Sequence, residues 1–189
     1  MRRNKIIIGV IIACICLLLL IETRAQQQNP QLAKIKSEMQ NLSFWAGHWQ
    51  GESVAQMGPG QSSKSIVNEY IQFKLDSTVL LIEGIGTLPA EIDANQSKVH
   101  HALAILSYNA EKNQFEFKSH LYDGRSTEAW FKHLGENKFL WGFDTPQGKI
   151  RYHLLLDPKD KTWKETGEFS RDGNQWMQFM EMNLTKVTQ

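Results

Sequence analysis

The chain has 189 residues, with 21 lysines and arginines against 20 acidic residues, so its formal net charge is +1. A charge this close to zero gives no electrostatic reason to expect binding to nucleic acid or to an anionic membrane surface. The only cysteines are Cys14 and Cys16, so the rest of the chain has no disulfide, no thiol nucleophile and no cysteine metal site.

The N-terminal segment 1–25 has the three parts of a secretory signal peptide. A basic start that includes Arg2 and Lys5 precedes the apolar run 6–21. The sequence Thr-Arg-Ala at 23–25 then places small side chains where a signal peptidase requires them. Cleavage removes four basic residues and one glutamate, which leaves 17 basic and 19 acidic residues and a net charge of −2. We therefore expect an exported protein, periplasmic or secreted, in a bacterial context.

Two other interpretations of this segment are possible. An uncleaved membrane anchor needs about 20 apolar residues, and the run 6–21 is shorter than that. A lipoprotein signal is loosely suggested by Ile11-Ile12-Ala13-Cys14, but cleavage there would leave the apolar residues 17–20 near the new terminus. Neither alternative explains the cleavage pattern that follows the apolar run. After cleavage, no membrane span is expected.

The mature protein is expected to begin at Gln26, because the small residues at 23–25 fit the cleavage rule. N-terminal sequencing of the exported protein tests this prediction. An intact Met1 or a lipid-modified Cys14 would contradict it.

After the cleavage site, the segment 26–43 is predicted to be a linker followed by a short helix. Proline suits the first turn of a helix, and Pro30 stands at that position. Four apolar residues then recur at helical spacing and share one face: Leu32, Ile35, Met39 and Leu42. The remaining segment, 44–187, is long enough for one substantial hydrophobic core and is predicted to be a single domain.

From Phe44 onward the apolar pattern has a period of two, which is typical of half-buried strands. Short turn signals such as Asp123-Gly124 and Asp172-Gly173 separate the alternating runs. This pattern predicts an all-β fold, an antiparallel meander of about eight to ten strands that closes into a barrel and so removes its exposed edges. The longest irregular stretch, 88–98, is a candidate lid or rim loop.

The segment Gly47-His48-Trp49 resembles the G-x-W motif that opens lipocalin-like, calycin-type barrels, in which the tryptophan closes the barrel floor. A longer resemblance is to an exported family called domain of unknown function 1579. It rests on residues 42–52 and 73–84, on Trp141-Gly142-Phe143-Asp144 and on residues 167–176. The resemblance implies a lipocalin-like barrel and carries no assigned activity.

Residues 47–51, Gly-His-Trp-Gln-Gly, also resemble the start of the nitrobindin motif, which belongs to haem-binding barrels of this type. The match then fails, since Ser53 stands where that motif has glycine and no Tyr-Pro follows. The haem ligand of that family is a late histidine, and residues 176–189 contain none. We therefore expect no haem and no other cofactor.

Several charged side chains fall on apolar faces of the predicted strands. Such groups are costly to bury unless they are paired or hydrogen-bonded. We predict that they form a polar cluster that orients a ligand inside the barrel, with the arginines as partners of the glutamates. The candidate ligand-binding residues are Glu69, Glu83, Arg125, Trp141 and Arg151. Glu165 and Glu181 also fall on apolar faces. The alternative is that some of these glutamates face water, because face assignment by alternation slips at every bulge.

The six histidines do not predict a metal site. His100 and His101 are neighbours in a predicted strand, so they point to opposite faces, and the others show no ligand spacing. The sequence also has no nucleophile-elbow motif and no glycine-rich phosphate loop.

Three functions remain open. The first is a carrier that binds a small, partly apolar molecule inside the barrel. The second is an enzyme that uses internal carboxylates for acid–base chemistry, which requires a raised pKa. The third is a structural or interaction module with a fully packed interior. The openness of the interior distinguishes the third from the others.

Overall fold

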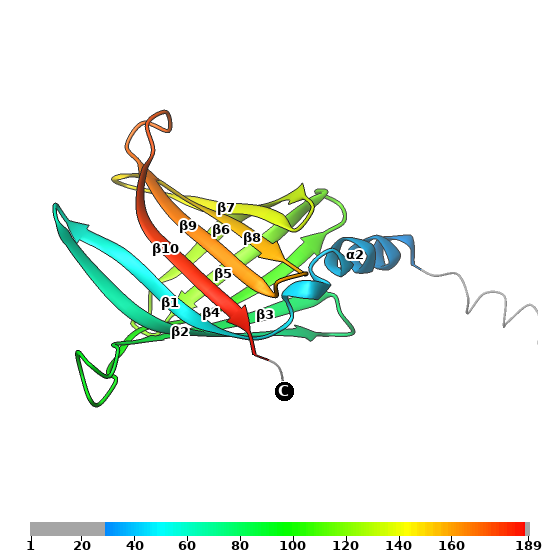
Figure 1. Ribbon diagram of the computed structural model, residues 1–189. Helices are drawn as coiled ribbons and strands as arrows, with labels where there is room; N and C mark the ends of the chain where they lie inside the picture. The colour runs from blue at the N-terminus through cyan, green and yellow to red at the C-terminus, as the bar shows by residue number, and fades with distance from the viewer. Residues whose placement is uncertain (1–28, 188–189) are drawn as a thin grey trace, which may run out of the picture.

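The computed structural model describes residues 29–187, so the predicted signal segment lies outside the described residues. Within these residues, one α-helix, a single turn of 3-10 helix and ten strands follow one another (Figure 1). The elements are α2 (Pro30–Gln40), η1 (Ser43–Trp45), β1 (Gly47–Gly58), β2 (Gln61–Lys74), β3 (Val79–Thr87), β4 (Lys98–Asn109), β5 (Gln114–Leu121), β6 (Ser126–Gly135), β7 (Lys138–Thr145), β8 (Gly148–Asp157), β9 (Thr162–Ser170) and β10 (Met177–Lys186).

The strands form a closed antiparallel barrel in which each strand pairs with its neighbours in sequence and β1 pairs with β10. The closing ladder runs from Trp49 opposite Lys186 to Ala55 opposite Met180. Closure leaves no strand edge unpaired, which is the physical reason why a meander of this size closes. The predicted all-β barrel is confirmed, and its ten strands lie within the predicted range.

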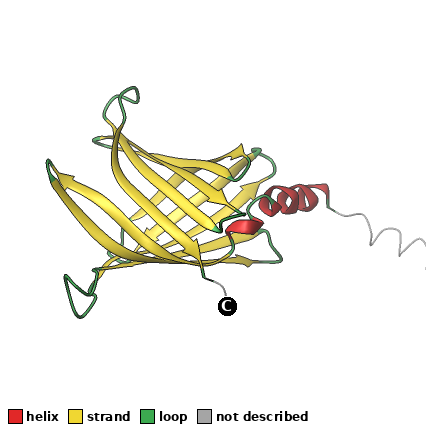
Figure 2. Cartoon of the chain, viewed as in Figure 1, coloured by secondary structure: helices red, strands yellow, loops and turns green. Residues whose placement is uncertain are grey.

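Helix α2 begins where the sequence predicted it. The side chain of Asn29 accepts a hydrogen bond from the backbone N–H of Gln31 at 3.0 Å, and Pro30 occupies the first helical position. Met39 on the helix and Leu42, which follows it, are fully buried. The helix lies at one end of the barrel (Figure 2). Within residues 29–187, no helix is long and apolar enough to cross a bilayer.

The end of the barrel beneath α2 is filled with aromatic side chains. Trp49 is fully buried, and its indole N–H donates to the backbone oxygen of Trp45 at 2.7 Å. Trp163 meets both tryptophans edge to face, with ring centroids 5.2 Å from Trp45 and 5.9 Å from Trp49. Phe139 stacks on Trp45 at 6.2 Å. These contacts form a packed floor, with Trp49 at the position that the G-x-W resemblance implies.

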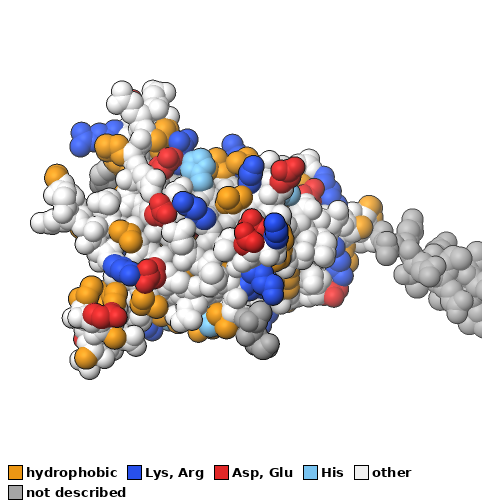
Figure 3. Space-filling model, in the orientation of Figure 1, with side chains coloured by type: hydrophobic (Ala, Val, Ile, Leu, Met, Phe, Trp, Pro, Cys, Tyr) orange, Lys and Arg blue, Asp and Glu red, His pale blue; other side chains and the backbone are white. Residues whose placement is uncertain are grey.

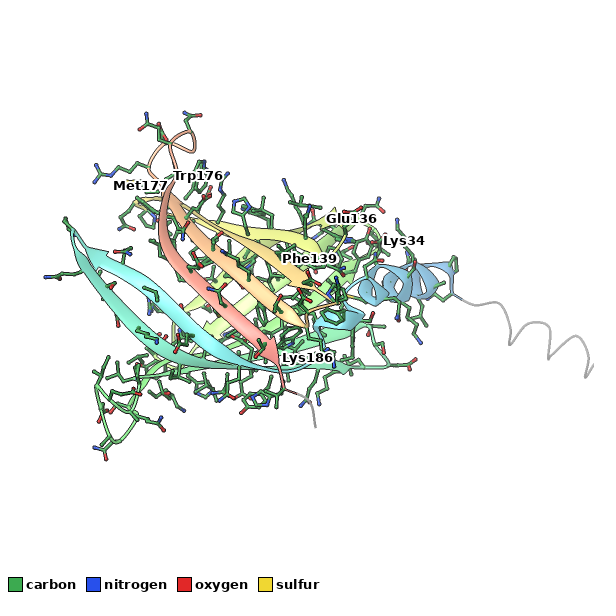
Figure 4. All side chains as sticks on the ribbon, viewed as in Figure 1. Lys34, Glu136, Phe139, Trp176, Met177 and Lys186 are labelled. Atoms are coloured by element: carbon green, nitrogen blue, oxygen red, sulfur yellow. The ribbon has the colours of Figure 1, made fainter. Side chains whose placement is uncertain are left out.

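Burial decreases along the interior toward the opposite end. That end carries the turns that follow β1, β3, β5, β7 and β9, including the predicted rim loop, and Trp176 and Met177 lie there, far from Phe139 at the floor (Figure 4). Inward-facing residues of this region keep partial exposure to solvent, and they are Ser53, Ala55, Ser65, Glu69, Ala102, Ser119, Thr127, Trp141, Phe143, Tyr152 and Phe179. We call this region the open half of the interior. The barrel is therefore packed at one end and reachable by solvent at the other.

Candidate functional site

Glu69 points into the open half of the interior. It lies on β2, opposite Trp49 of β1 on one side and Gly84 of β3 on the other. The adjacent inward residues Val67 and Ile71 are buried. A methyl group added to Gly84 would lie only 2.9 Å from the Glu69 carboxyl carbon, so the carboxylate occupies the space that the glycine leaves free. Glycine at position 84 is thus what allows this carboxylate to lie against the barrel wall.

A second carboxylate, Glu165 of β9, faces the same interior and is only 5% exposed. Its two oxygens accept hydrogen bonds from two indole N–H groups, that of Trp141 at 3.0 Å and that of Trp163 at 3.1 Å. Trp163 belongs to the packed floor and Trp141 to the open half. Glu165 therefore stands at the boundary between the two regions, held in place from both sides.

Burial makes both carboxylates costly to ionise. Burial raises the pKa of Glu69 to about 8, and the charge of Glu165 adds to this effect. Burial also raises the pKa of Glu165 to about 7, although its two indole hydrogen bonds oppose the rise. Within residues 29–187, the Glu69 carboxyl group has no hydrogen-bond or ion-pair partner. Near neutral pH, Glu69 is therefore mainly in its protonated form.

Aromatic rings form the wall beside the carboxylates. Trp141 stacks on Tyr152 with ring centroids 4.1 Å apart, and Phe179 meets Tyr152 edge to face at 5.9 Å. Gly167 lies beside Tyr152 and Phe179, and a methyl group added to it would come within 2.9 Å of both of these rings. Burial, followed by the charge of Glu165, raises the pKa of the Tyr152 hydroxyl, which thus stays protonated as a potential hydrogen-bond donor.

The five residues predicted to bind a ligand do not all meet. The structure places Glu69 and Trp141 in the open half of the interior, and their contact with a ligand stays a prediction. Glu83 lies on the outer face of β3, where it pairs with His101 at 2.9 Å. The inward residues of that strand are Leu80, Ile82, Gly84 and Gly86. The alternation of apolar and polar residues predicted the wrong face for Glu83, because both faces of β3 carry apolar side chains.

The two arginines also lie outside the barrel interior. Arg125 precedes β6 in an exposed turn and pairs with Asp123 at 2.7 Å. Arg151 lies on the outer face of β8, where it pairs with Glu168 at 2.6 Å and its guanidinium group lies 3.8 Å from the Trp176 ring centroid. The prediction that these arginines pair with the interior glutamates is therefore wrong. Each arginine instead finds a carboxylate close in sequence or on the neighbouring strand.

The sequence marked Glu165 only as one of several glutamates on apolar faces. Glu165 lies two residues after the buried Trp163 on β9, and the pairing of β9 with β8 has no bulge. Regular alternation from Trp163 was therefore the available signal that Glu165 faces the interior. Glu181 shows the opposite case: it pairs with Lys164 on the surface, since a bulge near Gln178 shifts the alternation of β10.

The outer wall offers weaker candidates. Open grooves run over β5–β6 and over β1–β10, and their charged residues form exposed ion pairs such as Lys118 with Glu128. On the face seen in Figure 3, acidic and basic side chains are interspersed rather than gathered into one patch. Within residues 29–187, no group of three histidine, cysteine, aspartate or glutamate side chains is arranged to hold a metal ion. The interior carboxylates are thus the most distinctive polar feature of the described part of the chain.

No protein-family profile matches the chain, and no curated protein sequence is significantly similar to it. Its fold is similar to the crystal structure of Rv2717c from M. tuberculosis, with a TM-score of 0.57 over 79% of this chain and 97% of that chain. The two sequences are 10% identical, so the similarity supports the barrel fold alone. The resemblance to the family of unknown function 1579 stays a prediction.

Proposed function

We propose that this protein is an exported binding protein that holds a small, partly apolar molecule in the open half of its barrel. The observation that supports this most strongly is the contrast within one interior. Trp49, Trp163 and Phe139 fill one end completely, whereas the inward side chains of the other end keep contact with solvent. A barrel whose only role is structural has no reason to leave aromatic and carboxylate side chains together in an incompletely packed interior.

The lining suits a ligand with both apolar and polar parts. Trp141 and Tyr152 offer aromatic surface, and Glu69 and the Tyr152 hydroxyl offer polar groups that the described residues leave without a partner. Small-molecule sites are typically concave and mostly apolar, with a few polar groups that fix orientation. Small inward residues such as Ala102 and Ser119 reduce the side-chain volume in this region.

A pair of tryptophan insertions on β4 tests this proposal. Ala102 faces the interior opposite Gly84, and its neighbour Leu103 faces outward and is 39% exposed. The wild-type protein is expected to bind the neutral fluorescent probe N-phenyl-1-naphthylamine saturably, with one probe per chain. Ala102→Trp should weaken this binding by about tenfold or more, because the indole occupies the site. Titration of probe fluorescence measures the effect.

Leu103→Trp is the matched control, since it adds the same side chain to the outer face of the same strand. It should leave the affinity for the probe unchanged, and circular dichroism checks that both variants are folded. Failure of the wild-type protein to bind the probe, or equal binding by all three proteins, would contradict a site in the barrel interior.

A second candidate function is acid–base catalysis, and one observation favours it. Glu69 and Glu165 have pKa values of about 8 and 7, which are near the working pH of a general acid or base. The two functions differ in the fate of the bound molecule. A carrier releases its ligand with an unchanged mass, whereas an enzyme releases a product of different mass or structure.

A further inference from the structure

We infer that the open half of the interior selects organic cations, specifically molecules in which a protonated amine is attached to an aromatic or other apolar body. This inference rests on the proposed function and names the chemical class of its ligand. Three observations support it: the lack of a basic partner for its carboxylates, the arrangement of its aromatic rings, and the free oxygens of Glu69.

The two carboxylates that face the open half have no basic partner among residues 29–187. Glu69 and Glu165 both face it, and among residues 29–187 no lysine or arginine forms an ion pair or hydrogen bond with either carboxylate. Lys186 faces the interior only at the floor, where its ammonium group donates to the backbone oxygen of Phe44 at 2.7 Å. A ligand ammonium group would therefore supply a basic partner and favour the ionised form of Glu69, whereas a fatty acid or another organic anion would find no basic group beside these carboxylates.

The aromatic wall favours the same ligands. A cation is attracted to the face of a tryptophan or tyrosine ring, and this attraction is strongest where water is excluded. Trp141 and Tyr152 stand next to Glu165, since Trp141 donates to its carboxylate and stacks on Tyr152. The protein already uses such contacts elsewhere, with Arg151 over Trp176 and Lys186 over Phe44. A carboxylate beside aromatic rings can bind both the charged and the apolar part of an aromatic amine.

The carboxylate of Glu69 is available to that ammonium group. Gly84 removes the side chain that would displace the carboxylate, and Ala102 lies opposite Gly84 on β4. Unlike Glu165, Glu69 has both oxygens free of hydrogen bonds to the described residues. It can therefore accept from a ligand ammonium group without breaking a contact of the protein.

Three probes that share one ring system and differ in charge test the inference. They are 2-(1-naphthyl)ethylamine, 2-(1-naphthyl)ethanol and 1-naphthylacetate, which are cationic, neutral and anionic at pH 7.5. Isothermal titration calorimetry on the wild-type protein should give at least about tenfold tighter binding for the amine than for the alcohol, and the weakest binding for the acetate. The wild-type comparison alone can overturn the inference, so it does not depend on a variant that folds.

Two carboxamide variants then locate the effect. Glu69→Gln should weaken binding of the amine by about tenfold while changing that of the alcohol by less than about twofold. The matched control is Glu83→Gln, which removes a carboxylate on the outer face of the adjacent strand and should change neither affinity. Equal affinities of the wild-type protein for the amine and the alcohol, or an amine affinity unaffected by Glu69→Gln, would overturn the inference.

These outcomes separate the inference from the proposed function. If N-phenyl-1-naphthylamine binds and Ala102→Trp blocks it, but the naphthyl amine has no advantage over the alcohol, the barrel is a binding protein for another class of ligand. If none of these probes binds, the proposed function is wrong, and the inferred selectivity for organic cations is wrong as well.

Discussion

Replacing Trp49 with alanine is expected to lower the free energy of unfolding by about 3 to 5 kcal/mol, the usual range for removal of a buried tryptophan. Trp49 is fully buried, packs edge to face against Phe44 and Trp163, and donates its indole N–H to the backbone oxygen of Trp45. The substitution leaves a cavity at the floor and removes the hydrogen bond to the Trp45 oxygen. A urea or guanidinium titration measures the loss.

Trp130→Ala is the control for this prediction. Trp130 lies on the outer face of β6, is 39% exposed and contacts the ammonium group of Lys132. Its removal should cost less than about 1 kcal/mol, because surface substitutions disturb little packing. A loss below about 1 kcal/mol for Trp49→Ala, or equal losses for the two variants, would show that the packed floor does not stabilise the barrel as described.

The stability of the ligand-free protein is expected to fall as the pH rises from about 5 to about 8. In this window the unfolded chain has already lost the proton of Glu69, whose ordinary pKa is 4.5, whereas the folded protein keeps it up to about pH 8. The folded state therefore binds more protons, and its stabilising effect is lost as the pH rises. After allowance for partial solvent contact, we expect Glu69 to contribute about 2 to 4 kcal/mol to this decrease.

Glu69→Gln removes this part of the pH dependence, because glutamine stays neutral at every pH. Denaturant titrations at pH 5 and pH 8 should show that the variant loses less stability between these values than the wild-type protein does. Glu83→Gln serves again as the control and should keep the wild-type pH dependence. Identical pH dependence of wild-type and Glu69→Gln proteins would mean that Glu69 ionises normally and does not lie in a desolvated interior.

Local patterns were sufficient to predict the fold. The helix start at Pro30 follows from the fixed backbone angle of proline, and the strands follow from regular alternation between turn signals. The floor position of Trp49 was implied by the resemblance of residues 47–49 to the G-x-W motif of lipocalin-like barrels. Each of these features depends on neighbours in sequence, so each could be predicted before the strand pairing was known.

The site was harder to predict because it depends on which face of each strand turns inward. Glu69 and Trp141 lie on strands where one face is clearly more apolar, and both point inward. Glu83 lies on β3, where Leu81 and Ile85 make the outer face look like a core face. The inward face of that strand carries two glycines, which give no hydrophobic signal, although Gly84 is the residue that accommodates Glu69.

The arginines illustrate a second limit. A buried carboxylate is expected to have a basic partner, and this expectation selected Arg125 and Arg151 from the sequence. Both arginines have closer partners, Asp123 and Glu168, which are two residues away and directly opposite on the next strand. The interior glutamates are therefore left without a basic partner among residues 29–187, a situation that the sequence alone did not suggest.

The most direct test of a ligand-binding interior is native mass spectrometry of the protein purified from its own source, alongside the Ala102→Trp variant. The proposal predicts that the wild-type protein carries a small molecule, released intact on activation, with one molecule per chain. The Ala102→Trp variant should be recovered at the mass of the protein alone. A wild-type protein that carries no small molecule, and that also fails to bind N-phenyl-1-naphthylamine, would contradict the proposal and indicate a barrel whose interior has no ligand.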